Sequence, residues 1–223
     1  MIIPLIILFL LGALQGAIGW IMVKSGLVPE KYFVGHVELT THFVAALGLL
    51  VYTLWFALRL LVPEQQSIHS AALKKFTVVL LLLLFVQLCY GGFMAGLRAA
   101  TVAPTWPTIN GEWFPASLFN ERGPANLVNN PFMVHFIHRG LAYLIVILII
   151  GWFISIQKTA LSPWLHKTKI LPLVLVLAQV LLGICTVLYS ASATALVWFG
   201  VLHQFTAMLL LVSLVWVLYL VRK

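Results

Sequence analysis

The stretch FMVHFIHRGLAY, residues 132–143, opens a long apolar run and places His135, His138 and Arg139 inside it. Runs of this kind cross the hydrocarbon core of a membrane. Ionisable side chains are costly at that depth, so they persist where they face the interior of a helix bundle and hold a partner. His203, near the start of the last apolar run, is a second such residue. These two places are therefore the first candidates for a functional site.

The composition is that of an integral membrane protein. Of the 223 residues, 63% are apolar and 8% are charged, and the mean hydropathy is +1.10, which is far from the balance of soluble domains. A spanning helix needs about 20 predominantly apolar residues. Six such runs are present, at residues 2–23, 38–62, 73–97, 132–156, 169–190 and 195–220. The first run lacks the basic leading segment of a signal peptide, so we interpret it as a span. The predicted fold is an all-α, six-helix transmembrane bundle.

The basic residues predict how this bundle is oriented. The formal net charge is +8, but Lys and Arg occupy the short loops between spans, which is typical of orientation signals and not of a nucleic-acid surface. One side carries Arg59, Lys74, Lys75, Lys158, Lys167, Lys169, Arg222 and Lys223, and the other carries Lys24, Lys31, Arg98 and Arg122. The richer side marks the cytoplasm. We therefore expect cytoplasmic termini, no nucleic-acid partner, and the long loop 98–131 outside as a compact lid.

Three histidines share one depth in the predicted membrane. His138, His203 and His42 lie seven, eight and six residues inside the outer ends of their spans. At about 1.5 Å rise per helical residue, each lies roughly 9–12 Å below the same outer face. A metal or a flat cofactor held between helices requires such a coincidence, although independent core histidines remain the alternative. His69 and His166 fall in cytoplasmic loops and are expected to be solvated.

His135 and His138 compete for the same role, because they are three residues apart on one helix. They point about 60° apart around the helix axis, so only one of them is expected to bind a given iron. We favour His138, which is deeper and is followed by Arg139, whose guanidinium suits a carboxylate at the outer surface. His36, at an outer helix mouth, is a weaker candidate for a substrate or proton role.

A short pattern repeats along the chain. Gln15 is followed four residues later by glycine and 27 residues later by His42, and Gln179 is followed four residues later by glycine and 24 residues later by His203. In the second copy this pair follows the span that carries His138, whereas nothing precedes the first copy. The repeat therefore predicts two further helices ahead of the first span, one of them with a His-Arg pair that would face His42.

The residue types favour heme over other metal centres. Zinc and di-iron sites need several ligands, usually with Cys, Asp or Glu. The chain has no Asp, and its glutamates, Glu30, Glu38, Glu64, Glu112 and Glu121, lie in loops or at a helix mouth. Cys89 and Cys185 lie inside apolar runs and are expected to behave as small buried hydrophobes. Heme needs one or two axial nitrogens, an apolar slot and basic groups at its propionates.

The segments that carry these residues resemble the heme A synthase family. The matching segments are Leu11–Leu27, Gln87–Ala99, Thr105–Trp113, Phe136–Tyr143, Gln179–Ile184 and His203-Gln204, which together extend over nearly the whole chain. The resemblance implies an eight-helix fold of two four-helix halves, of which the first two helices have no counterpart here. It also implies oxidation of the C8 methyl group of heme O to the formyl group of heme A.

The resemblance also implies a division of labour. Residues 73–223 would form a heme-b-binding half, with His138 and His203 as axial ligands and Arg139 and Arg98 as further cofactor-binding residues. Residues 1–72 would be the remnant of the substrate-heme half, where His42 would bind the iron of heme O. The glutamate that the family uses in catalysis has no counterpart, so no catalytic residue is assigned.

The resemblance finally suggests a setting. It implies a bacterial inner membrane with lipid around the chain, and heme O synthase, other cytochrome oxidase assembly factors and an electron-transfer protein as partners, with a homo-oligomer left open. Two rival classes are a heme b electron carrier and a non-catalytic assembly protein or small transporter that holds no cofactor.

Overall fold

The computed structural model describes residues 2–120 and 122–222. Glu121 and Lys223, on which the carboxylate and orientation arguments drew, lie outside the described residues, as does Met1 at the start of the 1–72 segment. The described residues fold into helices without a β-strand, and the pairings between extended segments are two isolated bridges in loops. Six of these helices are long and apolar enough to cross a membrane. The predicted all-α, six-helix bundle is therefore confirmed.

The helices agree with the predicted spans to within a few residues at most ends. The long helices are α1 (Ile2–Lys24), α2 (His36–Leu61), α3 (Ala71–Gly96), α6 (Pro131–Ile156), α8 (Leu171–Leu188) and α9 (Ala193–Leu220). The short ones are η1 (Glu64–Gln66), α4 (Ala99–Val102), η2 (Ala116–Phe119), α5 (Asn126–Asn129) and α7 (Pro163–Thr168). The predicted span 169–190 corresponds to α8, and the difference from the prediction is that α7 lies in the stretch 157–168, which was expected to be a loop. Pro172 in the first turn of α8 has no N–H to donate, so it starts a helix more readily than it continues one.

Side-chain caps set several helix starts. Ser70, Asn130 and Ser192 each accept a hydrogen bond from a backbone N–H in the first turn of α3, α6 and α9. Pro131 follows Asn130 and occupies the first position of α6, where a missing N–H costs nothing. These caps satisfy backbone donors that would otherwise be unpaired. On α6 and α9 they also set the helix starts from which the depths of His138 and His203 were counted.

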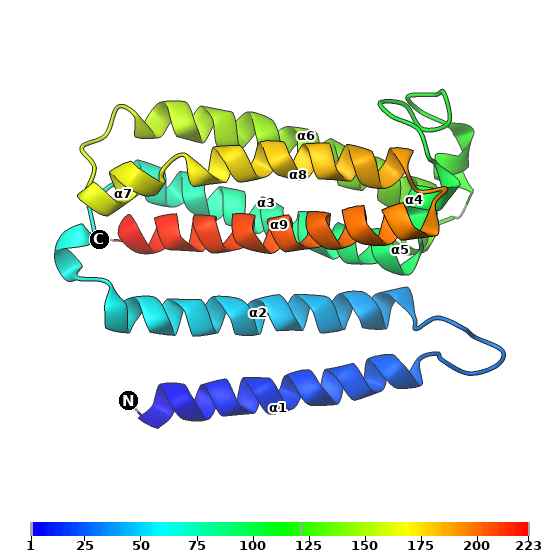
Figure 1. The fold of residues 1–223 in the computed structure, drawn as a ribbon, viewed down its shortest axis with the longest axis horizontal. Helices are drawn as coiled ribbons and strands as arrows, with labels where there is room; N and C mark the ends of the chain where they lie inside the picture. The colour runs from blue at the N-terminus through cyan, green and yellow to red at the C-terminus, as the bar shows by residue number, and fades with distance from the viewer. Residues whose placement is uncertain (1, 121, 223) are drawn as a thin grey trace.

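Four helices, α3, α6, α8 and α9, form a bundle around the core, and α2 packs on its α3 and α9 side. Buried apolar side chains such as Leu80, Ile149, Trp152 and Leu214 fill the bundle. Helix α1 packs on α2 at the flank and has no buried residue (Figure 1). The molecule therefore has one packed bundle and one lightly covered helix pair.

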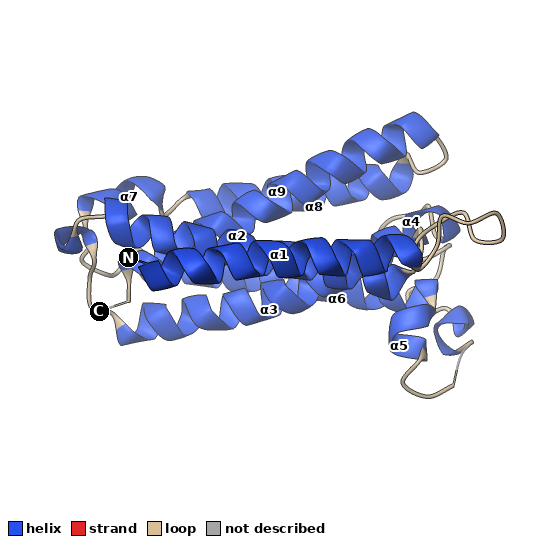
Figure 2. Cartoon of the chain, turned by 90° about the horizontal axis from the view of Figure 1, so that it is seen from below, coloured by secondary structure: helices blue, strands red, loops and turns tan. Residues whose placement is uncertain are grey.

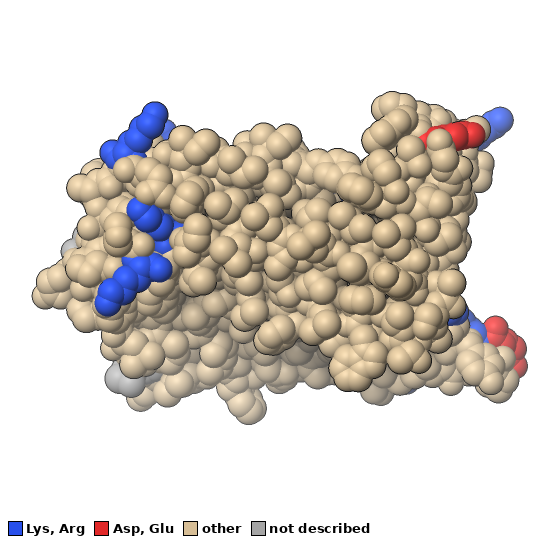
Figure 3. Space-filling model, turned by 45° about the horizontal axis from the view of Figure 1, so that its top comes forward, with Lys and Arg blue, Asp and Glu red and all other residues tan. Residues whose placement is uncertain are grey.

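Both ends of the described chain lie at the same end of the bundle, and the loop with α4 and α5 lies at the other (Figures 1 and 2). Basic side chains gather at the end with the termini, whereas acidic side chains appear at the opposite end (Figure 3). Cys89 and Cys185 are unpaired, and both are partly accessible and not buried as expected.

Candidate functional site

A cavity of about 510 Å³ opens inside the four-helix bundle and is lined by His138 and His203. Its size is in the range of small-molecule and cofactor sites. The ring centroids of the two histidines are 6.3 Å apart. The structure thus brings together the two histidines that the sequence placed at equal depth, on α6 and α9, with apolar groups such as Leu88 and Val176 around them.

The imidazole of His203 is oriented through both nitrogens. Its Nδ1 lies 3.0 Å from the backbone carbonyl oxygen of Gln179, which can only accept, so Nδ1 carries the proton. Its Nε2 lies 3.2 Å from the side-chain amide nitrogen of Gln179, which can only donate. Nε2 therefore carries the lone pair of the ring, which the Gln179 amide occupies in this structure. This is the tautomer of a metal-binding histidine whose second nitrogen is held by a carbonyl group.

His138 has a matching arrangement on the other side of the cavity. Its Nε2 lies 3.3 Å from the side-chain amide nitrogen of Gln87 on α3, so this nitrogen also carries the lone pair and accepts from the amide in this structure. Its Nδ1 is buried without a hydrogen-bond partner, and so is the side-chain oxygen of Gln87. Unpaired polar atoms inside an apolar bundle are costly and point to a group that completes the site.

Glycines make room for these rings. A Cβ on Gly183 would lie 3.0 Å from Cε1 of His203, and a Cβ on Gly91 would lie 3.6 Å from Cε1 of His138. Each glycine is one helical turn after the glutamine that bonds the same histidine. The sequence pattern Gln-x3-Gly therefore has a physical meaning: the glutamine orients the imidazole and the glycine lets it approach the helix.

The donor set fits a heme held by two histidines. Within residues 2–120 and 122–222, no cluster of three or more His, Cys, Asp or Glu side chains could hold a metal ion alone. Two neutral imidazoles in an apolar cavity suit heme iron, which takes its remaining ligands from the porphyrin. His138 and His203 would hold such a group from opposite helices.

His135 is buried, and its imidazole accepts a hydrogen bond from Arg139. Nε of Arg139 donates to Nε2 of His135 over 2.9 Å, which leaves that nitrogen unavailable to a metal. The remaining guanidinium nitrogens donate to backbone carbonyl oxygens of the outer loop, at Thr105, Pro107 and Thr108. This contact explains how two histidines on one helix have different tasks, although spacing alone placed them on one face.

Arg98 lies at the outer end of the same cavity. Its guanidinium stacks over the ring of Phe33 at 4.8 Å and is exposed. A carboxylate at the cavity mouth can therefore reach Arg98. Of the two arginines that the sequence singled out, Arg98 has the freer guanidinium.

His42 lies away from the pair, on the side of α2 that faces α1. Its Nδ1 is 3.2 Å from the side-chain amide nitrogen of Gln15, which also donates to the His42 carbonyl oxygen over 3.1 Å. A Cβ on Gly19 would lie 2.9 Å from Cε1 of His42. The unit at His42 thus repeats the units at His138 and His203, but its histidine does not line their cavity.

The other histidines have simpler surroundings. His36 shares a hydrogen bond of 3.0 Å with the side-chain oxygen of Asn129 at the outer end of α2. His69 lies in a loop as the sequence predicted, whereas His166 lies in the short helix α7, and both side chains are exposed. The sequence reasoning missed the role of Gln87 as a histidine partner, although its spacing to Gly91 carried the same signal as the two copies that were recognised.

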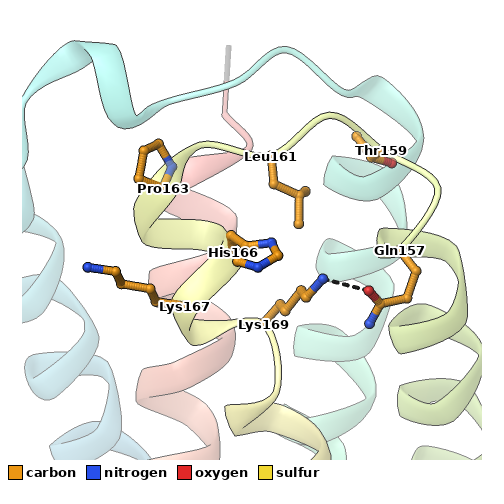
Figure 4. A pocket seen from close by; sticks show the side chains of 7 residues that line it. All are labelled: Gln157, Thr159, Leu161, Pro163, His166, Lys167 and Lys169. Atoms are coloured by element: carbon orange, nitrogen blue, oxygen red, sulfur yellow. Dashed lines mark hydrogen bonds between the residues drawn. The ribbon is translucent and has the colours of Figure 1, made fainter.

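A second hollow, of about 600 Å³, lies at the opposite end of the bundle, between the end of α6 and the start of α8. His166 points into it, and Lys169 donates to Gln157 across it (Figure 4). Its lining is a solvated loop surface with basic side chains, which agrees with an orientation signal at the membrane surface. None of the histidines that share one depth lines it, so the candidate site is the cavity at His138 and His203.

Comparison with known proteins gives a consistent result. A family model described as cytochrome oxidase assembly protein matches residues 1–215. A heme A synthase of Flavobacterium johnsoniae is 35% identical over 221 residues, which cover 98% of this chain and 63% of the relative. A heme A synthase of Rhizorhabdus wittichii is 36% identical over 211 residues, covering 94% and 58%.

A third relative, a heme A synthase of Novosphingobium aromaticivorans, is 37% identical over 220 residues, which cover 95% of this chain and 60% of the relative. The chain thus spans about three-fifths of the length of the curated relatives that it matches.

Proposed function

This chain belongs to the cytochrome oxidase assembly protein family, and from that premise we propose that it is a heme A synthase-like membrane oxidoreductase. Its reaction would convert the C8 methyl group of heme O to the formyl group of heme A. The observation that carries the proposal is the pair of oriented imidazoles, His138 and His203, across an apolar cavity in a chain whose relatives are heme A synthases.

His138 and His203 would hold a resident heme b. In each ring Nε2 carries the lone pair, and the neutral glutamine amide that donates to it would give way to the iron, while the carbonyl of Gln179 fixes the His203 tautomer. When bound, the heme would supply one-electron redox chemistry. Arg98 at the cavity mouth would pair with a propionate carboxylate, and the apolar wall would keep water from the ring.

His42 would bind the iron of the substrate, heme O. The support is the repeated unit: Gln15 bonds the His42 imidazole and Gly19 makes room for it, as at the two other histidines. On this reading residues 1–72 belong to a substrate half and residues 73–223 to the resident-heme half. No catalytic residue is assigned among the described residues.

The surroundings of the reaction follow from charge and chemistry. The basic end of the bundle would face the cytoplasm, with both chain ends there, and the lid would face outward across a bacterial inner membrane (Figure 3). Heme O synthase would supply the substrate, oxidase assembly factors would take the product, and an electron-transfer protein would complete the redox cycle.

The experiment that tests this function is a product assay. The chain is purified in detergent with its resident heme and incubated with heme O, a reductant and oxygen, and the extracted hemes are identified by mass. We expect any heme A that forms to depend on His42, and we expect His42→Ala to weaken the binding of heme O while the resident heme remains. Heme A production that is unaffected by His42→Ala would contradict the role of His42.

Two other outcomes would replace the proposal. A single, non-exchangeable heme with no second binding event would identify an electron carrier. A colourless protein with unaltered spectra in His138→Ala would identify a transporter or assembly scaffold without a cofactor. The titration of heme O into the purified chain separates these outcomes from the enzyme.

A further inference from the structure

We propose that Arg139 is a latch that holds the lid segment, residues 105–108, closed over the heme cavity, with His135 as the residue that positions it. The side chain of Arg139 extends from α6 to the outer loop. There its guanidinium donates to the carbonyl oxygens of Thr105 at 2.6 Å, Thr108 at 3.0 Å and Pro107 at 3.2 Å. The proposal rests on the proposed function only in taking the cavity to be a heme site.

The guanidinium is nearly saturated by these contacts. Arginine has five N–H donors in a planar fork, and four hydrogen bonds are made, three to the lid and one to His135. Hydrogen bonds from a charged donor are stronger than neutral ones, and the low polarity of the bundle strengthens them further. Arg139 is thus committed to the lid, and a propionate would have to compete with three carbonyl groups for it.

His135 fixes the direction of the guanidinium. The imidazole is buried, at 1% exposure, and its Nε2 accepts from Nε of Arg139 over 2.9 Å. Because Nε2 accepts, the proton of a neutral ring resides on Nδ1, which is buried without a partner. The ring thus keeps the tautomer that accepts from Arg139, although its Nδ1 then has no hydrogen-bond partner. We infer that the bond to Arg139 stabilises this arrangement. His135 and Arg139 are one turn apart on α6, so the helix itself sets their alignment.

Hydrogen bonds within the lid segment hold it together. The hydroxyl of Thr105 donates to the carbonyl oxygen of Thr108 over 2.8 Å and accepts from the N–H of Asn110 over 2.7 Å. The side chain of Asn110 also donates to the carbonyl oxygen of Val102. The segment is therefore held together by its own bonds, is tied to α4 through Asn110, and is tied to α6 through Arg139.

The lid also borders the cavity. Trp106 lies between two of the carbonyl groups that Arg139 binds, and its side chain lines the cavity with His138 and Arg98. Release of the segment would therefore withdraw an indole from the cavity wall. The latch then controls how readily a heme leaves or enters from the outer side.

The test compares Arg139 with Arg122, an exposed arginine of the outer loop that does not line the cavity. Amide hydrogen exchange of residues 103–112 is measured by mass spectrometry in the heme-loaded chain, in Arg139→Lys and in Arg122→Lys. Lysine keeps the positive charge but cannot bridge three carbonyl groups. We expect exchange in the lid to rise roughly tenfold or more in Arg139→Lys, with no change in Arg122→Lys. Transfer of heme to apomyoglobin should accelerate in parallel in Arg139→Lys.

A second variant and a second background keep the test decisive. His135→Phe removes the acceptor and should raise lid exchange in the same direction by a smaller factor. His203→Ala serves as the background with little bound heme. Arg139→Lys should raise lid exchange in this background as well, because the latch acts on the protein itself. A rise confined to heme-loaded protein would assign Arg139 to a propionate and overturn the latch, as would unaltered exchange. These readouts do not depend on heme A formation, so they stand apart from the test of the proposed function.

Discussion

The helix pair α1–α2 and the bundle of α3, α6, α8 and α9 contain the same unit in different surroundings. In each unit a glutamine amide lies 3.2 or 3.3 Å from an imidazole nitrogen, and a glycine one turn later leaves space for the ring. In the bundle two units face each other and enclose a cavity. Among the described residues, no such unit faces His42.

Burial makes the difference between the two regions quantitative. Helix α1 has no buried residue, whereas α9 has nine. The unit therefore suffices to orient a histidine, but a closed site requires a second unit opposite. The local Gln-x3-Gly pattern therefore orients a single histidine, and helix packing decides whether two such histidines can face one bound group.

The largest expected effect separates the two regions by heme content. His203→Ala removes one of the two proposed axial nitrogens from the cavity and should abolish most of the heme that we propose it holds, as should His138→Ala. His42→Ala should leave that heme in place because His42 lies outside the cavity. The heme-to-protein ratio after pyridine extraction measures this. Equal loss in all three variants would remove the distinction between the regions.

The next effect concerns stability. Leu80, fully buried in α3, fills the bundle core, so Leu80→Ala should destabilise the chain by about 2–5 kcal/mol. Leu14 on α1 is 53% exposed, and Leu14→Ala should change stability by less than about 0.5 kcal/mol. Unfolding by sodium dodecyl sulfate in mixed micelles measures both. Similar costs would mean that α1 is packed as tightly as the core.

A smaller effect is expected at the glycines. Gly183→Ala places a Cβ 3.0 Å from Cε1 of His203, so the ring must shift, at a cost of about 1–3 kcal/mol. Gly91→Ala makes an ordinary contact of 3.6 Å with His138 and should be tolerated. Heme titration followed by absorbance gives the affinity of each variant. Equal affinities would show that the close approach to His203 has no role in orienting its ring.

The smallest expected effect compares two hydrogen bonds of equal length. Trp152 donates to the hydroxyl of Thr77 in the core, and Tyr52 donates to the carbonyl oxygen of Pro4 on α1, each over 3.1 Å. Trp152→Phe should lower the unfolding free energy by about 1 kcal/mol. Tyr52→Phe should leave global unfolding nearly unchanged and raise proteolysis of α1. Both variants are followed in the same detergent titration, and a larger cost for Tyr52→Phe would reverse the ranking of the two regions.

Much of the fold could be predicted because membrane spans are local. The length of an apolar run and the need to satisfy backbone hydrogen bonds within the bilayer determine a helix without reference to its neighbours. The short helix α7 was missed because its sequence, PWLHKT, is too short and too polar to form an apolar run, so residues 157–168 were predicted as a loop. Its start depends on the Ser162 cap and on Pro163 in the first turn, which are local signals that hydropathy does not detect.

Part of the candidate site was also readable from the chain. Depth along a helix is a count of residues, so the common level of His138, His203 and His42 needed no structure. The partners of Arg139 were a different matter. An outer carboxylate was expected, but in the structure the side chain meets carbonyl groups 31 to 34 residues earlier in the chain. Backbone acceptors have no sequence signature, so nothing in the residue types marks them.

The sequence by itself predicted the six long helices and the position of each ionisable group along them, because both follow from composition and from the rise of a single helix. Only the tertiary structure decided that His138 faces His203, that His42 turns toward Gln15, and that Arg139 binds the lid. These choices depend on the rotation of helices about their axes and on the path of a loop, which packing between distant segments sets.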